Sequence, residues 1–291
     1  MDKVLVIDVG GTKTNVSLVK SSNSKIEILS SEIFLTQLKP DLAISQIESI
    51  CRKKNIQVDS LSLSLPGLWD KMGVLKESFF LSSWLEYPFV ANLAKALNVK
   101  NCIWETDVIC GALGEASVVQ ETTEQKSILY INLGTGVGAA LIKDGKPFKS
   151  NSALTLRMQK LVLPYQDELY CGVELISGGT LLEISKYDSI ERLYKDYKMG
   201  NVEAIDIMSK AQAQLSAWII NLFYLFAPDS IILGGGLTYD WEVLAEGAVE
   251  ITNEELDNQV AILPSKLKEM APIHGAYINF SRSFSDATKP R

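Results

Sequence analysis

A pattern of strand, polar residue, glycine turn and second strand occurs twice in this chain and limits the folds open to it. The first copy, residues 3–20, reads KVLVIDVGGTKTNVSLVK, and the second, residues 127–144, reads SILYINLGTGVGAALIKD. At one common offset, Asn132 aligns with Asp8 and Gly134 aligns with Gly10. This repeat predicts two similar halves that face one another across a cleft. Taken alone, the first copy is equally compatible with an ordinary β-hairpin.

The first turn has the composition of an anion-binding loop. Gly10 and Gly11 are expected to adopt backbone conformations closed to other residues and to let a ligand approach closely. Asp8, which ends the apolar strand, is expected to hold the hydrated Mg²⁺ that accompanies a phosphate. The groups predicted to face the anion are the amides and hydroxyls of Gly11, Thr12, Lys13 and Thr14.

Two later glycine clusters extend this prediction to a whole nucleotide. A second phosphate-binding turn facing the first would clamp a triphosphate, and the third cluster follows another apolar strand, where a nucleoside could rest on bare backbone. The residues expected to bind the nucleotide here are Gly134, Thr135, Gly136, Gly234, Gly235 and Gly236.

Composition excludes several other classes of protein. The 291 residues suffice for two medium domains, and 47% hydrophobic with 22% charged residues is typical of a globular chain. The net charge of −7, without a basic stripe, argues against nucleic acid as a partner. No apolar run approaches about 20 residues, so no membrane span is expected. The initial strand leaves no room for a signal peptide, and the scattered cysteines fit a reducing compartment, so we expect a cytoplasmic protein.

Five motifs together identify a family resemblance. DVGGTKTN, LPGLWD, ETDVICGALGEA, LGTGVGAALIKDGK and ILGGGL resemble the ROK (repressor, open reading frame, kinase) family of bacterial sugar kinases, within the superfamily of sugar kinases, heat-shock protein 70 and actin. The resemblance covers nearly the whole chain. It implies a two-domain α/β actin-like ATPase (ribonuclease H-like) fold with a nucleotide cleft between the domains. We expect a small domain at residues 1–117, a larger one at 118–274, and a closing helix at about 275–291 that packs back on the first.

The resemblance also assigns the catalytic base. In ETDVICGALGE, Asp107 occupies the place of the family's catalytic aspartate. A carboxylate that opens a helix has an alternative role as an N-cap. Its position after a strand, between the two phosphate turns, favours catalysis.

The acceptor side departs from the family pattern. The resemblance makes Pro66-Gly67 a loop that lines the sugar pocket. Phe80 stands where the family has a sugar-binding asparagine, and Thr106 replaces a second one. The change at Phe80 removes hydrogen bonding and adds an apolar face. Together with the change at Thr106, it leads us to expect an acceptor other than plain glucose.

Further departures follow the second turn. The family's sugar-binding glutamate and histidine are absent from residues 151–164, where Arg157 is either a surface residue or a group for an acidic or altered substrate. Glu174 is the better match for the family's later substrate-facing glutamate, with Glu183 as the alternative. The family's zinc cluster is reduced to Cys171-Gly172, so no structural zinc is expected.

Three hypotheses of function remain at this stage. The first is an ATP- and Mg²⁺-dependent kinase for a small sugar-like acceptor. The second is a catalytically weak ROK-like protein that senses ATP or a sugar. The third, an actin-like ATPase or scaffold, does not require both a Pro-Gly loop and a helix-opening aspartate. The chain starts too close to its first strand for a DNA-binding helix-turn-helix, and a homodimer is left open.

Overall fold

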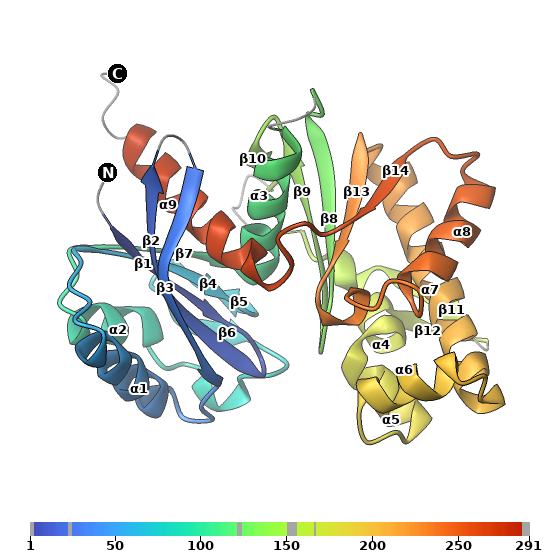
Figure 1. Ribbon diagram of the computed structural model, residues 1–291, viewed down its shortest axis with the longest axis horizontal. Helices are drawn as coiled ribbons and strands as arrows, with labels where there is room; N and C mark the ends of the chain where they lie inside the picture. The colour runs from blue at the N-terminus through green and yellow to red at the C-terminus, as the bar shows by residue number, and fades with distance from the viewer. Residues whose placement is uncertain (1–2, 23–24, 121–123, 150–155, 166, 287–291) are drawn as a thin grey trace. The chain divides into compact units, whose positions relative to one another are not determined.

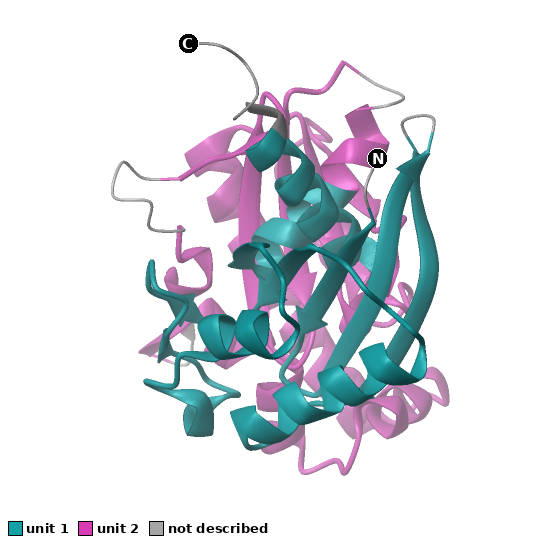
Figure 2. Ribbon diagram, turned by 90° about the vertical axis from the view of Figure 1, so that its left-hand side faces the viewer, with its two compact units in different colours: residues 1–114, 270–291 teal, residues 115–269 magenta. Residues whose placement is uncertain are grey.

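The computed structural model describes residues 3–22, 25–120, 124–149, 156–165 and 167–286. Contacts divide the chain into two compact units (Figure 2): unit 1 comprises residues 1–114 and 270–291, and unit 2 comprises residues 115–269. Each unit has its own hydrophobic core, so each is described separately below.

Unit 1 is built on a five-stranded sheet with the order β3-β2-β1-β4-β7 (Figure 1). The strands β3, β2 and β1 are antiparallel neighbours, whereas β4 and β7 continue the sheet in parallel with β1. A short hairpin, β5 with β6, follows β4. The strands are β1 (Val4–Val9), β2 (Lys13–Ser22), β3 (Lys25–Leu35), β4 (Ser60–Leu65), β5 (Leu68–Trp69), β6 (Leu75–Glu77) and β7 (Asn101–Thr106).

Helices cover both faces of this sheet because its central strands are apolar on both sides. On one face, α1 (Pro40–Lys53) and α2 (Phe89–Ala96) pack on the leucines of β4 and on β1. On the other face, α9 (Ala271–Asp286) packs on β1, and Ser62 of β4 donates a hydrogen bond of 2.7 Å to the Ala276 carbonyl. The sequence of β4, SLSLSL, alternates accordingly: its leucines pack against α1 and α2 on one face, and Ser62 contacts α9 on the other.

The helix α9 crosses α3 (Asp107–Gln120) at unusually short range. A Cβ atom on Gly275 would lie 1.6 Å from the Cys110 carbonyl oxygen, and one on Gly114 would lie 2.3 Å from the Ala271 carbonyl oxygen. Only glycine permits this approach of the two backbones. α9 belongs to unit 1 and begins four residues before the expected closing helix; the expected end of that helix, residues 287–291, lies outside the described residues.

Unit 2 repeats the sheet of unit 1. Its order is β10-β9-β8-β13-β14, again three antiparallel neighbours followed by two parallel strands. The second sequence copy forms β8 and β9 just as the first forms β1 and β2. The strands are β8 (Ser127–Leu133), β9 (Val137–Lys143), β10 (Lys146–Pro147), β13 (Ser230–Gly234) and β14 (Ala261–Pro264).

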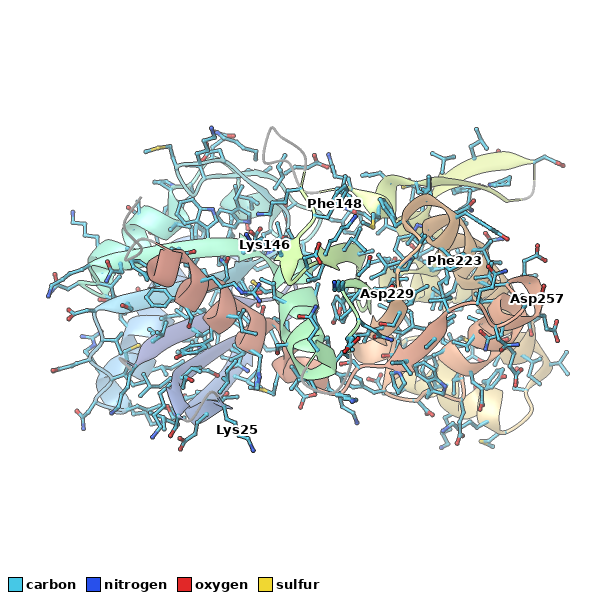
Figure 3. The ribbon with its side chains drawn as sticks, turned by 90° about the horizontal axis from the view of Figure 1, so that it is seen from above. Lys25, Lys146, Phe148, Phe223, Asp229 and Asp257 are labelled. Atoms are coloured by element: carbon cyan, nitrogen blue, oxygen red, sulfur yellow. The ribbon has the colours of Figure 1, made fainter. Side chains whose placement is uncertain are left out.

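The helices of unit 2 form its remaining core together with a small hairpin, β11 (Val162–Tyr165) and β12 (Glu168–Cys171). In the long helix α7, Trp218 and Ile219 are buried, whereas Tyr224 near its end is exposed. Figure 3 labels Phe148, which follows β10 and whose ring lies 6.4 Å from that of Phe226. The helices are α4 (Gly172–Ile176), α5 (Gly178–Ser185), α6 (Ile190–Lys198), α7 (Val202–Phe226) and α8 (Ala245–Glu255).

Candidate active site

Three polar side chains form a row across the parallel strands of unit 1. Asp8 of β1 is in register with Ser64 of β4, and Ser64 is in register with Glu105 of β7. Residues in register on neighbouring strands point to the same face of a sheet. Since this row lies at the carboxyl ends of the strands, it occupies the edge where open α/β sheets bind ligands.

Asp8 is held by a neighbour that the sequence did not single out. The hydroxyl of Ser64 donates a hydrogen bond of 2.5 Å to Asp8 Oδ1. Burial raises the pKa of Asp8 to about 7, the hydrogen bond from Ser64 opposes this shift, and the negative charge of Asp107 adds to it. A carboxylate in such surroundings gains from a nearby cation, because the cation offsets the cost of desolvation.

Asp107 is the first residue of α3 and directly follows β7. The backbone N–H of Val108 donates a 2.8 Å hydrogen bond to Asp107 Oδ1. Burial raises the pKa of Asp107 to about 6, against the opposing effect of backbone donors. The side chain nevertheless keeps partial contact with solvent. At neutral pH it is therefore ionised and able to accept a proton.

The structure corrects the expectation for the first glycine turn in two respects. Neither Gly10 nor Gly11 has a positive φ; both are required because a side chain would clash, with the Lys13 carbonyl at Gly10 and with Phe80 at Gly11. Thr14 does not face a ligand, because it is buried as the second residue of β2 and its hydroxyl lies 2.9 Å from that of Thr36.

Thr36 is a second residue that the sequence analysis missed. Its hydroxyl donates to the Gly10 carbonyl at 2.8 Å, and its backbone N–H donates to the Thr12 carbonyl at 2.9 Å. Together with the Gly10 N–H to Lys13 carbonyl bond of 2.8 Å, these bonds hold the turn in one shape. A preformed turn of this kind can present its backbone amides to an anion without further ordering.

The predicted acceptor loop also lies at the carboxyl edge of the unit 1 sheet. Gly67, just after β4, has a φ of +91°, and a Cβ atom there would lie 2.4 Å from the Glu77 carbonyl oxygen. Phe80 packs directly on Gly11, since a Cβ atom on Gly11 would lie 2.7 Å from Phe80 Cγ. The loop that carries Phe80 therefore lies beside the turns after both β1 and β4.

Thr106, the last residue of β7, has a buried hydroxyl with no hydrogen-bond partner among the described residues. Buried polar groups are nearly always paired, and unpaired ones are found where a ligand or water completes them. Its position immediately before Asp107 is consistent with the expectation that it contacts the acceptor.

In unit 2, the second glycine turn is held by a helix. The Gly134 N–H donates to the Gly136 carbonyl at 2.9 Å. At the start of α5, the Gly178 N–H donates to the Gly134 carbonyl at 2.9 Å and the Gly179 N–H to the Thr135 carbonyl at 3.1 Å. The SGGT motif that begins α5 was the available signal for this contact, and the sequence analysis did not use it.

The third glycine cluster lies beside the second turn within unit 2. Gly234 is in register with Asn132, and Gly235, with a φ of +89°, would place a Cβ atom 2.3 Å from the Leu133 carbonyl oxygen. By contrast, a Cβ atom on Gly236 would have no heavy atom within 4 Å, and one on Gly134 would have only two, at 3.9 and 4.0 Å. The two loops therefore expose adjoining stretches of bare backbone on which a flat group could rest.

Two predicted substrate residues occupy less specific surroundings. Arg157 is exposed and follows residues 150–155, which lie outside the described part of the chain together with much of the expected sugar-binding segment. Glu174 accepts hydrogen bonds of 2.8 Å from the backbone N–H and the thiol of Cys171, and these hold its pKa below its usual range. This capping role at the start of α4 accounts for the carboxylate without a substrate.

The described residues contain no group of three or more His, Cys, Asp or Glu side chains arranged to hold a metal ion. Mg²⁺ does not require such a cage, since it keeps several waters and needs only one or two carboxylates beside substrate phosphates. Asp8 meets this requirement: beyond the bond from Ser64, no described group donates a hydrogen bond to its carboxylate. The residues present therefore fit a hydrated Mg²⁺.

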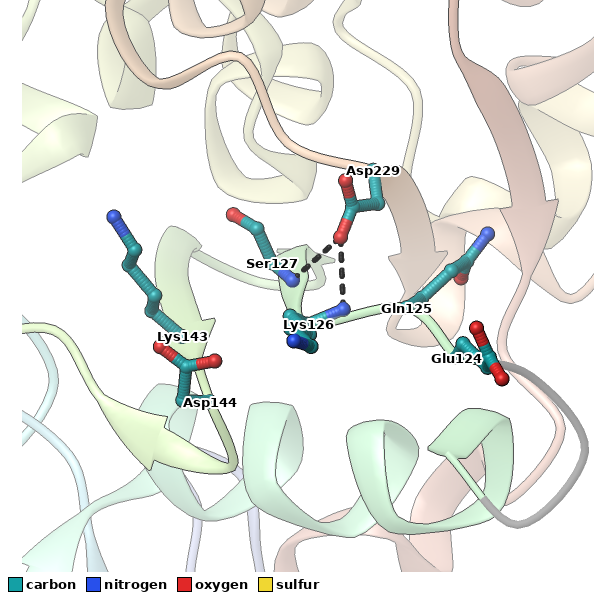
Figure 4. Close-up of a pocket in the computed structure, with 7 residues that line it drawn as sticks. All are labelled: Glu124, Gln125, Lys126, Ser127, Lys143, Asp144 and Asp229. Atoms are coloured by element: carbon teal, nitrogen blue, oxygen red, sulfur yellow. Dashed lines mark hydrogen bonds between the residues drawn. The ribbon is translucent and has the colours of Figure 1, made fainter.

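A separate pocket of about 660 Å³ lies at the opposite ends of β8 and β9 from the glycine turn (Figure 4). Within it, Asp229 accepts hydrogen bonds of 2.8 Å from the backbone N–H groups of Lys126 and Ser127. This carboxylate therefore ties β13 to β8. The lining residues are Glu124, Gln125, Lys126, Ser127, Lys143, Asp144 and Asp229. No helix in the described part of the chain is long and apolar enough to cross a membrane.

Comparisons with known proteins agree with this geometry. The sequence model of the ROK family matches residues 4–282. The chain is 29% identical to the N-acetyl-D-glucosamine kinase of Aliivibrio fischeri over 273 residues, covering 82% of this chain and 85% of the relative. It is 31% identical to an uncharacterised protein of Clostridium perfringens over 194 residues, covering 63% of this chain and 65% of that protein. The ROK family glucokinase of Streptomyces griseus, solved in complex with glucose and AMPPNP, superposes with a TM-score of 0.77 at 17% identity, covering 94% and 97% of the two chains.

Two sheets of the same strand order, each with a glycine turn after its first parallel strand, define the actin-like ATPase fold. Within this class, the chain belongs to the ROK family. The family and the fold expected from the five sequence motifs are thus confirmed.

Proposed function

We propose that this chain is an ATP-dependent sugar kinase that phosphorylates a hydroxyl group of a sugar other than plain glucose. The family match and the named kinases among its relatives support the activity. The observation that supports the mechanism is the pair of carboxylates, Asp8 and Asp107, at one edge of the unit 1 sheet beside a preformed glycine turn.

In the proposed reaction, the acceptor oxygen attacks the γ-phosphorus of ATP while the bond to the β,γ-bridging oxygen breaks and ADP leaves. Asp107 accepts the proton of the attacking hydroxyl, a contribution of roughly 10²–10⁴ in rate. The amides of the glycine turns hold the phosphates, and the backbone at Gly236, which borders open space, supports the adenosine, whereas Gly234 is covered by Tyr130. Phosphoryl transfer depends mainly on such alignment and charge neutralisation.

Asp8, oriented by Ser64, would hold Mg²⁺ through its bound water. When present, the ion neutralises charge on the transferred phosphoryl group. The expected cytoplasmic location is supported by four cysteines without a disulfide. It remains a prediction, as does a homodimer.

A coupled assay of ATP turnover over a panel of sugars, amino sugars and polyols tests the proposal. We expect turnover well above the acceptor-free rate with at least one amino sugar or modified sugar, and low catalytic efficiency with glucose. Sites built to hydrogen-bond a hydroxyl discriminate strongly, and here two such groups are replaced by Phe80 and Thr106. Efficient phosphorylation of glucose would show that these two replacements do not set the specificity.

The same replacements favour one second candidate, a sensor that binds ATP or a sugar without efficient transfer. Calorimetry with AMPPNP and each sugar distinguishes the two functions. Binding of nucleotide and sugar without turnover supports the sensor, whereas the absence of nucleotide binding contradicts both.

A further inference from the structure

Phe79 and Phe80 place two aromatic rings at the carboxyl edge of the unit 1 sheet. Phe80 lies on Gly11, which follows β1, and the Glu77 carbonyl and the Ser78 Cβ atom pack on Gly67, which follows β4. The ring centroids of Phe79 and Phe80 are 5.1 Å apart in an edge-to-face arrangement. Phe80 therefore lies beside the turn that follows Asp8, and the loop that carries both rings lies beside Gly67 of the predicted acceptor loop.

The loop that carries these rings is firmly anchored. Ser78 Oγ accepts hydrogen bonds from the backbone N–H groups of Phe80, at 3.3 Å, and Leu81, at 3.1 Å. Leu81 and Trp84 are buried, and the Trp84 indole donates to the Gln37 carbonyl at 3.1 Å. Phe79 is nevertheless 86% exposed. The exposure of Phe79 is thus imposed by a well-packed loop, and the ring is available to a ligand at little cost in ordering.

Among the described residues expected to contact the acceptor, Phe80 is apolar and Thr106 is polar. Thr106 contributes a single hydroxyl, which has no partner among the described residues. A fully hydroxylated sugar face placed against Phe79 would lose hydrogen bonds to water without replacement. An apolar substituent in the same place would instead be removed from water and stabilised by contact with the rings.

We propose that the acceptor is a sugar with an apolar substituent larger than a methyl group, an acyl chain or an aryl group, which packs against Phe79 and Phe80. This inference rests on the proposed function and deepens it. The substituent undergoes no chemical change; the hydroxyl directed to Asp107 receives the phosphoryl group as described above.

An acceptor series tests the inference in the wild-type chain. We would measure kcat/KM for glucose, N-acetylglucosamine, N-butanoylglucosamine, N-phenylacetylglucosamine and phenyl β-D-glucoside. The N-acyl series should rise by about fourfold for each methylene that becomes buried, chiefly through a lower KM. A flat or falling series, with no gain for the phenyl glucoside over glucose, would overturn it.

Phe79→Ala should abolish the rise of kcat/KM along the acceptor series and leave the melting temperature unchanged, since the ring contributes little to the core. Met72→Ala, which removes another exposed apolar side chain from the nearby β5–β6 turn, serves as the matched control and should keep the wild-type series. Phe80→Leu keeps an apolar contact with Gly11 and should reduce only the gain from aryl substituents. An equal loss on all acceptors in Phe79→Ala would contradict a role in selecting the substituent.

Binding measurements separate this inference from the proposed function. Titration of each acceptor into the chain saturated with AMPPNP should show tighter binding as the substituent grows. Turnover or binding without this trend contradicts the inference alone. Absence of both turnover and AMPPNP binding contradicts the kinase function itself.

Discussion

Burial raises the pKa of both Asp8 and Asp107, but the two carboxylates have different neighbours. Asp8 accepts a hydrogen bond from a strand residue, Ser64, whereas the donors to Asp107 among the described residues are backbone groups at the start of α3. Pairs of carboxyl groups with distinct surroundings commonly divide their roles in catalysis. The arrangement suits Asp107 as the base and Asp8 as the cation ligand.

Asp107→Asn tests the role of the base. Asparagine keeps the size and polarity of the side chain but cannot accept a proton during transfer, so kcat should fall by at least about a hundredfold. Nucleotide affinity, measured by calorimetry, should stay nearly constant. An asparagine serves about as well as aspartate at a helix start, so the melting temperature should change little. Turnover close to that of the wild type on a good acceptor would remove Asp107 from the mechanism.

Asp8 predicts a pH dependence of stability in the metal-free protein. Its pKa is about 7 in the folded chain and near 3.8 when unfolded, so the folded state binds the proton more tightly. The contribution of Asp8 to folding stability is therefore lost as the pH rises through about 7. Asp8→Asn should stabilise the chain relative to the wild type, by roughly 2–3 kcal/mol more at pH 8 than at pH 5.

Thermal unfolding at both pH values, in EDTA and without nucleotide, measures this difference. Asp59→Asn, which alters an exposed carboxylate, is the control and should show no comparable trend. Equal effects of Asp8→Asn at pH 5 and pH 8 would be inconsistent with a raised pKa.

At the scale of the element, the glycine loops of unit 2 contain glycines of two kinds. Gly235 is required by the backbone, because its φ is positive and Leu133 leaves no space for a side chain. Gly236 and Gly134 border open space, so their lack of a side chain is not explained by packing. The nucleotide site proposed above would account for it.

Gly236→Val and Gly235→Val should therefore behave differently. The first should weaken AMPPNP binding by at least about tenfold with little change in melting temperature, because the new side chain occupies only the ligand's space. The second should lower the melting temperature markedly, since valine rarely adopts a positive φ. Calorimetry and thermal unfolding of both variants check this; unchanged nucleotide affinity in Gly236→Val would contradict the assignment of this loop.

At the scale of the whole molecule, a nucleotide that binds only the folded chain should stabilise it. At a concentration of about 100 Kd, this linkage amounts to roughly 2.7 kcal/mol, so Mg²⁺ with AMPPNP should raise the melting temperature by several degrees. EDTA should remove most of the increase if Asp8 holds the ion. An identical increase with and without EDTA would argue against a magnesium site, and no increase at all would argue against the nucleotide site.

Much of the architecture could be predicted because its signals are local. Apolar runs, glycine turns and the repeat at a common offset predicted two related halves, and the two sheets do share one strand order. Asp8 could be selected because it ends the apolar run of β1 beside the glycine turn, and Asp107 because the family resemblance places the catalytic aspartate there. Thr14 was grouped with the turn because the composition of the turn gave no sign that its hydroxyl would be buried against Thr36.

The sequence by itself determined the class of fold, through its repeat and through motifs that resemble one family, and it drew attention to the two carboxylates because they lie within those motifs. Only the tertiary structure decided how these residues are held. The contacts that hold them join segments that are distant in the sequence: Ser64 bonds to Asp8, Thr36 bonds to Gly10, Phe80 packs on Gly11, and the start of α5 bonds to the second turn. Such contacts arise from packing of whole elements, which no local pattern of residues specifies.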